Sequence, residues 1–174
     1  EDGFRDAKKY QATKDEKLSM APSTLEEAIE TYRVVLETIG ELTGSEIAPR
    51  APEMDKIGLK FDNGKVTFPK PMDEAYNVIR DAGLQPYSIS RKYGGLGIPC
   101  VVQSMVMELL ARGDAALSIA IGCVNLAETI ERFASKEMKD AVIPRMATGE
   151  ITGAMALTEP NYGSDLPNVQ TRAV

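Results

Sequence analysis

A chain of 174 residues, 43% hydrophobic and 26% charged, is long enough for one globular domain with its own core. Twenty basic against twenty-six acidic residues give a net charge of −6, which argues against nucleic acid as a partner because phosphate binding requires a basic surface. The sequence contains no histidine, which excludes Ser-His-Asp catalysis, Cys-His catalysis and any histidine-ligated metal within this chain.

Neither a targeting signal nor a run of apolar residues long enough for a membrane span is present. We therefore expect a cytoplasmic protein with no membrane span. The chain opens on Glu1 and not on methionine, so we expect a longer parent protein. Cys100 and Cys123 lie in apolar surroundings without metal-ligand spacing, and we interpret them as reduced core thiols; no metal site is predicted.

The first 22 residues are polar and rich in lysine, and we predict an extension that is at best partly ordered. Ser23-Thr24-Leu25-Glu26-Glu27 then has the pattern of a capping box, with either hydroxyl as the cap, so a helix should start there. Apolar residues recur along this helix at steps of three and four, which predicts one face buried in a helical bundle. These residues are Leu25, Ala28, Ile29, Tyr32, Val35, Leu36, Ile39 and Leu42. Pro49 and Pro52 end or bend the helix.

Over residues 58–69, apolar and polar residues alternate about the pair Asn63-Gly64, which is a strong signal for a two-residue hairpin turn. A small β-ribbon is predicted. Pro71 opens the next helix, and Gly83 is its expected C-cap. Gly94, Gly95 and Gly97 follow, but no apolar strand precedes them and no Gly-Lys-Ser comes after, so we interpret this stretch as a closely packed turn and not as a phosphate loop.

Three further helices are predicted. The first spans 101–111, supported by an ion pair between Glu108 and Arg112. The second, capped by Asp114, runs from 115 to about 133 and should be central in the bundle because its first half is almost wholly apolar. Ser135 caps the third, and Pro144 is expected to start a fresh turn.

The stretch 151–166 is the strongest candidate for function. Its apolar run 154–157 predicts a short buried strand, and the following Glu-Pro-Asn-Tyr-Gly-Ser-Asp is rich in turn formers. Gly163 would allow a positive φ, and Ser164 offers an N–H and a hydroxyl to an anion such as phosphate. Thr158 adds a hydroxyl at the end of the strand. A plain turn fits the same residues.

Three ordered segments carry a resemblance to the acyl-CoA dehydrogenase family, and it extends loosely back to about Thr24. Tyr93-Gly94-Gly95-Leu96-Gly97-Ile98-Pro99 resembles the glycine turn before that family's substrate-side helix. Residues 138–150, ending Ile-Pro-Arg-Met-Ala-Thr-Gly-Glu, resemble the helix and turn before its flavin strand. Ala156-Leu157-Thr158-Glu159-Pro160-Asn161-Tyr162-Gly163-Ser164-Asp165-Leu166 resembles its flavin-contact segment. The ribbon sequence Gly-Lys-Val-Thr-Phe-Pro is similar to an insertion of the larger bacterial members.

The resemblance implies a mainly α fold: after the extension 1–22, residues 23–150 would be the family's amino-terminal helical bundle with the ribbon inserted, and 151–174 the first strand or strands of its truncated middle β domain. The implied activity of the parent is α,β-dehydrogenation of an acyl-CoA thioester with FAD, electrons passing to an electron-transferring flavoprotein. A homo-oligomer is implied for the full-length protein. The base that takes the α-proton would lie beyond residue 174, so no catalytic residue is assigned and the chain alone is expected to be inactive and to bind FAD weakly or not at all.

By position in the motif, Leu157 and Thr158 would contact the flavin's pyrimidine end and Met155 would lie beside the ring. Ser164, with Gly163 allowing the approach, would serve the FAD pyrophosphate and the CoA side. We assign substrate binding to Ser164, Met105 and Leu109. At helical spacing, Met105 and Met107 also fit plain core packing.

Glu159 and Asp165 are a tempting acid/base pair, but nothing makes them converge on one substrate atom. We assign Asp165 to hydrogen bonds within the loop and Glu159 to a salt bridge or solvent. Two alternatives stay open: an acyl-CoA oxidase-like flavoenzyme of the same fold, and a non-catalytic helical interaction module.

Overall fold

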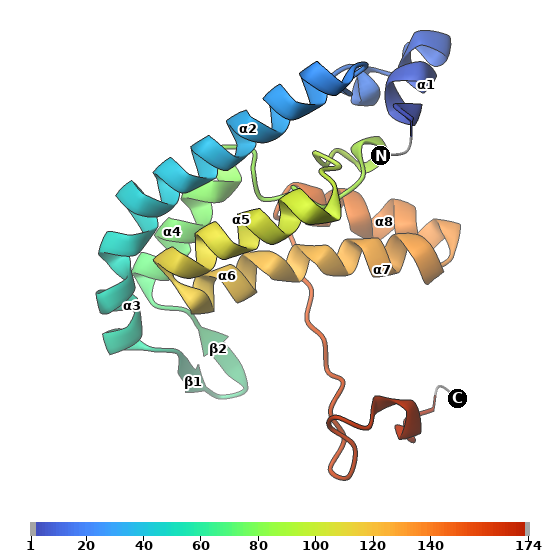
Figure 1. Cartoon of the computed structure of the whole chain (residues 1–174). Helices are drawn as coiled ribbons and strands as arrows, with labels where there is room; N and C mark the ends of the chain where they lie inside the picture. Colours follow the sequence, from blue (N-terminus) through green and yellow to red (C-terminus); the bar gives the residue numbers. More distant parts are fainter. Residues whose placement is uncertain (1–2, 173–174) are drawn as a thin grey trace.

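The structure is a computed structural model that describes residues 3–172, and within that range eight α-helices and one two-stranded ribbon form the fold (Figure 1). The helices are α1 (Arg5–Thr13), α2 (Leu25–Leu42), α3 (Ala51–Ile57), α4 (Lys70–Asp81), α5 (Cys100–Gly113), α6 (Ala115–Gly122), α7 (Leu126–Phe133) and α8 (Lys136–Ala147). The strands are β1 (Lys60–Asp62) and β2 (Lys65–Thr67). The mainly helical fold class is therefore confirmed.

One hydrophobic core lies where α2 packs on α5 and α5 packs on α6, with α4 and the loop before α5 closing the other side (Figure 1). Its fully buried side chains come from these elements, from the turn after α2 and from α8: Ile39, Ile47, Ile79, Tyr87, Val106, Leu110, Leu117, Ile121 and Ile143. Among the helices of residues 3–172, none combines the length and hydrophobicity that spanning a bilayer requires.

Local end signals place the helices where the sequence predicts them. Thr24 caps α2, because its hydroxyl accepts the Glu27 N–H at 3.2 Å while the Glu27 carboxylate accepts the Ser23 N–H at 2.7 Å. Asp114 caps α6 by accepting the Leu117 N–H at 2.6 Å. Gly83, with φ of 71°, follows α4, and the Leu84 N–H donates to the Ile79 carbonyl at 3.1 Å, which closes the helix end.

The amino-terminal segment is more ordered than predicted. Residues 5–13 form α1, and a 3₁₀ turn over Glu16–Leu18 follows. Leu18 is 1% exposed, in a turn that packs on the 3₁₀ turn Arg91–Tyr93, and Asp6 lies 3.3 Å from the Arg91 guanidinium. The polar composition of the segment did not indicate this order, because a single buried leucine and one partly buried ion pair hold it in place.

The ribbon forms as predicted. Phe61 pairs with Val66 across the antiparallel strands, and Asn63 and Gly64 both have positive φ, as a two-residue hairpin turn of this twist requires. Its apolar side chains remain exposed, including Phe61 at 75% and Phe68 at 45%. The side chains of the two strands therefore do not contribute to the helical core.

Three expectations about the helices are wrong. Leu25 and Ile29 on α2 are exposed, because the core lies against the later turns of that helix. The predicted helix 115–133 is two helices, α6 and α7, joined by a 3₁₀ turn over Cys123–Asn125, and Ile119 on α6 is 68% exposed. Pro144 lies inside α8 and starts no new turn.

Two smaller expectations also fail. The ion pair of Glu108 with Arg112 is absent from the ion pairs found in residues 3–172. Cys100 is exposed at the start of α5, whereas Cys123 is partly buried, so the core interpretation does not hold for Cys100.

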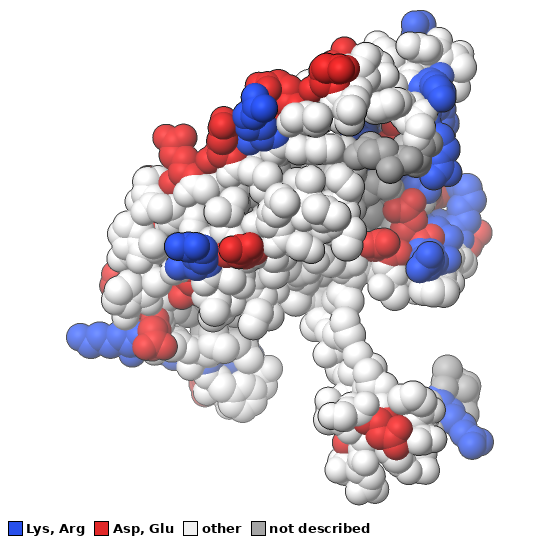
Figure 2. All heavy atoms as spheres, in the orientation of Figure 1, with Lys and Arg blue, Asp and Glu red and all other residues white. Residues whose placement is uncertain are grey.

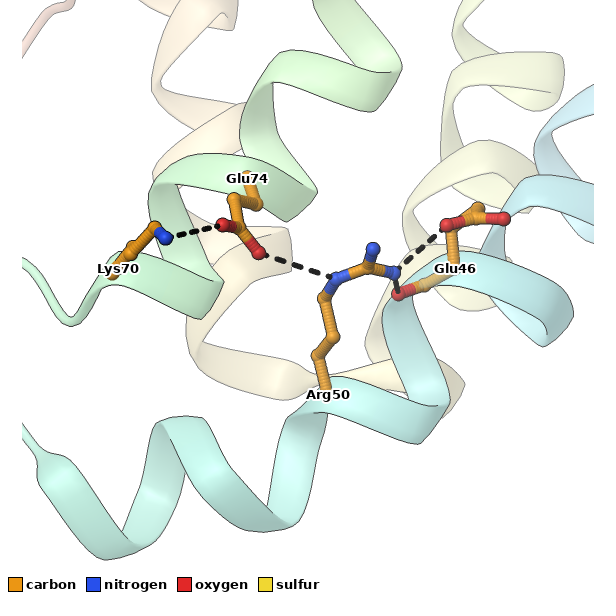
Figure 3. Close-up of polar contacts among 4 residues, drawn as sticks. All are labelled: Glu46, Arg50, Lys70 and Glu74. Carbon is orange, nitrogen blue, oxygen red and sulfur yellow. Dashed lines mark hydrogen bonds and ion pairs between the residues drawn. The ribbon is translucent and has the colours of Figure 1, made fainter.

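Arg50 connects the end of the α2 region to α4 (Figure 3). Its Nη1 donates to the Glu46 carbonyl and lies 2.9 Å from Glu46 Oε2, and its Nε lies 3.8 Å from Glu74, which also lies 3.4 Å from Lys70 Nζ. All four side chains are partly solvent-exposed, so each pair contributes about 0–1 kcal/mol. The network orients two elements and does not form a reactive site.

Charge is unevenly spread over the surface. Figure 2 shows charged side chains along α2 and at the end where α1, α7 and α8 lie, whereas the surface over α5 and α6 is largely uncharged. Large apolar side chains are exposed on these two helices: Val101, Met105 and Ile119.

Candidate functional site

The segment that follows α8 leaves the helical body and runs away from it (Figure 1). Residues 154–157 are exposed and form no strand, so the predicted buried strand is not found. A strand needs a neighbour to satisfy its backbone, and none lies beside this stretch within residues 3–172. The segment is extended, but it is unpaired and uncovered.

The loop beyond it closes on itself through Glu159. The backbones of Glu159 and Tyr162 exchange two hydrogen bonds of 3.1 Å, and the Glu159 carboxylate accepts the N–H groups of Gln170 at 2.9 Å and Thr171 at 2.7 Å. The Thr171 hydroxyl also donates to this carboxylate, and this bond, followed by those from the Gln170 and Thr171 N–H groups, lowers the pKa of Glu159. Asp165 accepts the Asn168 side-chain amide at 2.8 Å, as expected, whereas Glu159 organises the loop and forms no salt bridge within the described residues.

The five predicted flavin-contact residues all lie on this segment and are exposed. They are Met155, Leu157, Thr158, Gly163 and Ser164. The loop brings Thr158 beside Gly163, since a Cβ placed on Gly163 would lie 3.8 Å from the Thr158 methyl group. Gly163 does not have the positive φ that was expected, so its conformation is open to other residues.

Two backbone donors of the loop have no partner. Within residues 3–172, the N–H groups of Gly163 and Ser164 make no hydrogen bond, and neither does the Ser164 hydroxyl. Consecutive unpaired N–H groups at a turn are the arrangement that binds anions in proteins. The loop therefore leaves these donors available, and an anion site at Ser164 stays a prediction.

An apolar pocket of about 390 Å³ opens where the segment leaves the body; we call it the segment-side pocket. Residues 152–154 form one wall, and α4, α6 and the ribbon supply the others. Its lining is Phe68, Met72, Asp73, Tyr76, Leu117, Ala120, Cys123, Thr152, Gly153 and Ala154. The pocket and the donor loop thus belong to one continuous stretch of chain.

Gly153 allows this stretch to lie against the helices. A Cβ at Gly153 would lie 2.7 Å from Leu126 Cδ1 and 3.1 Å from the Cys123 carbonyl oxygen, closer than side chains approach. Tyr76 is half-buried beside the pocket, and burial raises the pKa of its hydroxyl. Neither Tyr76 nor Gly153 was singled out from the sequence, although the isolated glycine in an apolar run marks a close backbone approach.

The predicted substrate residues are not brought together. Met105 is 45% exposed on α5, Leu109 packs against the core, and Ser164 lies far along the protruding segment. None of the three lines the segment-side pocket. Met107 packs in the core, where its sulfur accepts the Tyr87 hydroxyl at 3.1 Å, and the core interpretation holds for it.

A second, polar hollow of about 470 Å³ lies between α1 and the turn at Arg91–Tyr93. Two of its cations already have carboxylate partners: Arg91 pairs with Asp6, and Lys92 lies 2.7 Å from Glu131. The hydrogen bond that Lys92 donates to the Glu131 carboxylate raises the pKa of Lys92. These pairs hold the turn in place, and the segment-side pocket is the better candidate site.

Comparison with known proteins agrees with the motifs. Residues 30–150 match the family model described as acyl-CoA dehydrogenase, N-terminal domain. The 3-methylmercaptopropionyl-CoA dehydrogenase of Ruegeria pomeroyi is 33% identical over 168 residues, which are 91% of this chain and 28% of that protein. The butyryl-CoA dehydrogenase of Syntrophomonas wolfei is 31% identical over 131 residues, which are 72% of this chain and 21% of that protein.

Solved structures show the same fold. Butyryl-CoA dehydrogenase from Megasphaera elsdenii superposes with a TM-score of 0.64 at 26% identity, over 80% of this chain and 35% of that one. Glutaryl-CoA dehydrogenase from Mycobacterium smegmatis gives a TM-score of 0.66 at 26% identity, over 82% and 34%. The chain spans about a third of the length of these relatives, or less.

Proposed function

The chain belongs to the acyl-CoA dehydrogenase family, and from that membership we infer that it is the amino-terminal part of an FAD-dependent enzyme that dehydrogenates an acyl-CoA thioester. Its electrons would pass to an electron-transferring flavoprotein, and the full-length protein would form a homo-oligomer. One observation carries the proposal: an apolar pocket and a loop with unpaired backbone donors lie on the same stretch of chain.

The residues present fit the cofactor. The N–H groups of Gly163 and Ser164 are available to a pyrophosphate, and the exposed Thr158 hydroxyl to a polar ring edge. When bound, FAD supplies the acceptor for the hydride that leaves the acyl β-carbon. Met155 and Leu157, exposed along the same extended stretch, would cover one side of the ring.

The segment-side pocket would take the acyl chain. Leu117, Ala120 and Met72 exclude water from an alkyl group, and residues 152–154 join that group to the donor loop. The protein's contribution is then alignment, which holds the reacting carbons beside the cofactor.

No carboxylate on this segment is placed to take the α-proton. The carboxylate of Glu159 accepts hydrogen bonds from Gln170 and Thr171, and that of Asp165 accepts one from Asn168. We therefore propose that the base belongs to a part of the parent protein outside these residues, and that this chain alone is inactive.

A flavin titration tests the proposal on two proteins, this 174-residue chain and the intact parent protein. After gel filtration, the parent should retain stoichiometric yellow cofactor that bleaches on adding an acyl-CoA, and this chain should retain little. Ser164→Ala in the parent should weaken flavin retention, whereas Ser104→Ala, at an exposed serine of α5, should not. A parent protein that retains no flavin would exclude the dehydrogenase.

A further inference from the structure

A second apolar pocket, which we call the ribbon-side pocket, adjoins the segment-side pocket. It has a volume of about 450 Å³, and its walls are the base of the ribbon, α3 and the outer face of α6, including Leu59, Ala116 and Ile119. Phe68, Met72 and Ala120 line both pockets. Because three residues are common to the two, the pockets are direct neighbours that share part of their walls.

The lining of the ribbon-side pocket is suited to an alkyl group. Its two carboxylates are Asp55 and Asp114, and the Asp114 carboxylate already caps α6 through the Leu117 N–H. The flexible side chains Met54 and Met72 adapt to occupants of different shape. Each pocket falls within the usual size of small-molecule sites, roughly 300–1,000 Å³.

Phe68 stands at the junction. It follows β2 and precedes Pro69 and α4, so the ribbon and α4 fix its backbone while its ring remains 45% exposed. Phe61 provides a natural comparison on the same ribbon, because it is 75% exposed and lines neither pocket. The same residue type thus occurs once at the junction and once away from it.

We propose that the two pockets form one groove for the acyl chain and that Phe68 sets the length of chain the groove accepts. The inference rests on the proposed function, since the groove begins at residues 152–154, which lead into the donor loop. Short acyl chains would end at the Phe68 ring in the segment-side pocket. Longer chains would displace that ring and continue between Leu59 and Ile119.

The test compares butanoyl-CoA with hexadecanoyl-CoA on the intact parent enzyme carrying Phe68→Ala, Ala120→Leu or Phe61→Ala. Phe68→Ala opens the junction and should raise kcat/KM for the long chain relative to the short one by about tenfold or more, because one methylene in an apolar pocket already discriminates by about 10–200-fold. Ala120→Leu narrows the junction and should shift the ratio in the opposite direction. Phe61→Ala should leave the ratio unchanged.

Calorimetry with hexadecyl-CoA thioether, which cannot react, measures binding independently of turnover. Its affinity should rise in Phe68→Ala, fall in Ala120→Leu and stay the same in Phe61→Ala. Equal ratios for the parent, Phe68→Ala and Ala120→Leu, in enzymes that hold flavin and turn over, would overturn the groove and leave the proposed function standing. A parent protein without flavin or acyl-CoA oxidation would instead overturn both. If Ala120→Leu does not fold, Phe68→Ala still decides, because its ring is half exposed.

Discussion

Gly95 lies in the turn before α5, where its backbone packs closely against Ile89. A Cβ there would lie 2.0 Å from the Ile89 carbonyl oxygen, so the backbone itself would have to move. We predict that Gly95→Ala lowers the free energy of unfolding by about 3 kcal/mol or more. Gly40→Ala is the matched control: inside α2, nothing lies within 4 Å of the added methyl, and we expect a gain of about 0.5–1 kcal/mol. Urea denaturation measures the free energy of unfolding of the two variants. Equal changes in Gly95→Ala and Gly40→Ala would refute the steric argument.

Glu159 makes the loop at 159–171 sensitive to acid. Its pKa in the folded loop is lowered, chiefly by the Thr171 hydroxyl and the Gln170 N–H, so its stabilising effect is complete above the ordinary glutamate pKa of about 4.3 and is lost as the pH falls through the lowered value. We predict that the amides of Gln170 and Thr171, measured against their intrinsic exchange rate at each pH, are protected at neutral pH and lose that protection in strong acid or in Glu159→Gln. Exchange at Leu110, deep in the core, serves as the control. Protection that is unchanged in Glu159→Gln would contradict this account.

At the scale of elements, Leu18 is the main apolar anchor of the amino-terminal segment, beside the ion pair of Asp6 with Arg91. Leu18 is 1% exposed outside the main core, in a turn packed against Arg91–Tyr93. We predict that Leu18→Ala costs about 2 kcal/mol or more and accelerates amide exchange in α1 before it affects α5. Met20→Ala, at a residue 85% exposed, should change neither. Identical exchange of α1 in both variants would show that the segment is held by other contacts.

The element boundaries that the sequence predicts are those with a local cause. Thr24, Gly83, Asp114 and Asn63-Gly64 each act on backbone groups within a few residues, so their effect can be read from the neighbouring sequence. Burial depends on distant parts of the chain. Leu25 and Ile29 follow a helical period and are nevertheless exposed, and Leu18 is buried by a turn more than seventy residues later.

The same distinction applies to the candidate site. The loop residues Thr158, Gly163 and Ser164 could be proposed from the sequence because they lie within one short motif. The segment-side pocket could not be predicted, because its walls come from α4, α6, Phe68 and residues 152–154, which no single stretch of sequence brings together. Substrate binding by Met105 and Leu109, which do not line that pocket, stays a prediction. The predicted strand at 154–157 failed because a strand requires a partner, and hydrophobicity alone does not supply one.

For the whole molecule, the exposed apolar surface between the ribbon and the protruding segment should be detectable. Ile119, Leu59 and Phe68 are each 45–68% exposed there, which is unusual for large apolar side chains gathered on one side. We predict that 1-anilinonaphthalene-8-sulfonate fluoresces with this chain and that Ile119→Ser lowers the signal, whereas Phe133→Ser, at an exposed residue at the end of α7, does not. The intact parent protein should bind less dye. Equal signals from the chain and the parent would show that this surface stays open.

The exposed edges of the ribbon bear on whether this chain aggregates. Within the described residues, β1 and β2 pair with each other alone, so each has an outer edge whose N–H and C=O groups can recruit another extended chain. The exposed apolar side chains of Phe61 and Val66 would strengthen such pairing. Each strand, however, is only three residues long and carries a lysine, Lys60 or Lys65. Short length and lysines at the edge discourage stacking into fibrils. Replacing these two lysines would therefore favour aggregation, although neither lysine belongs to the core.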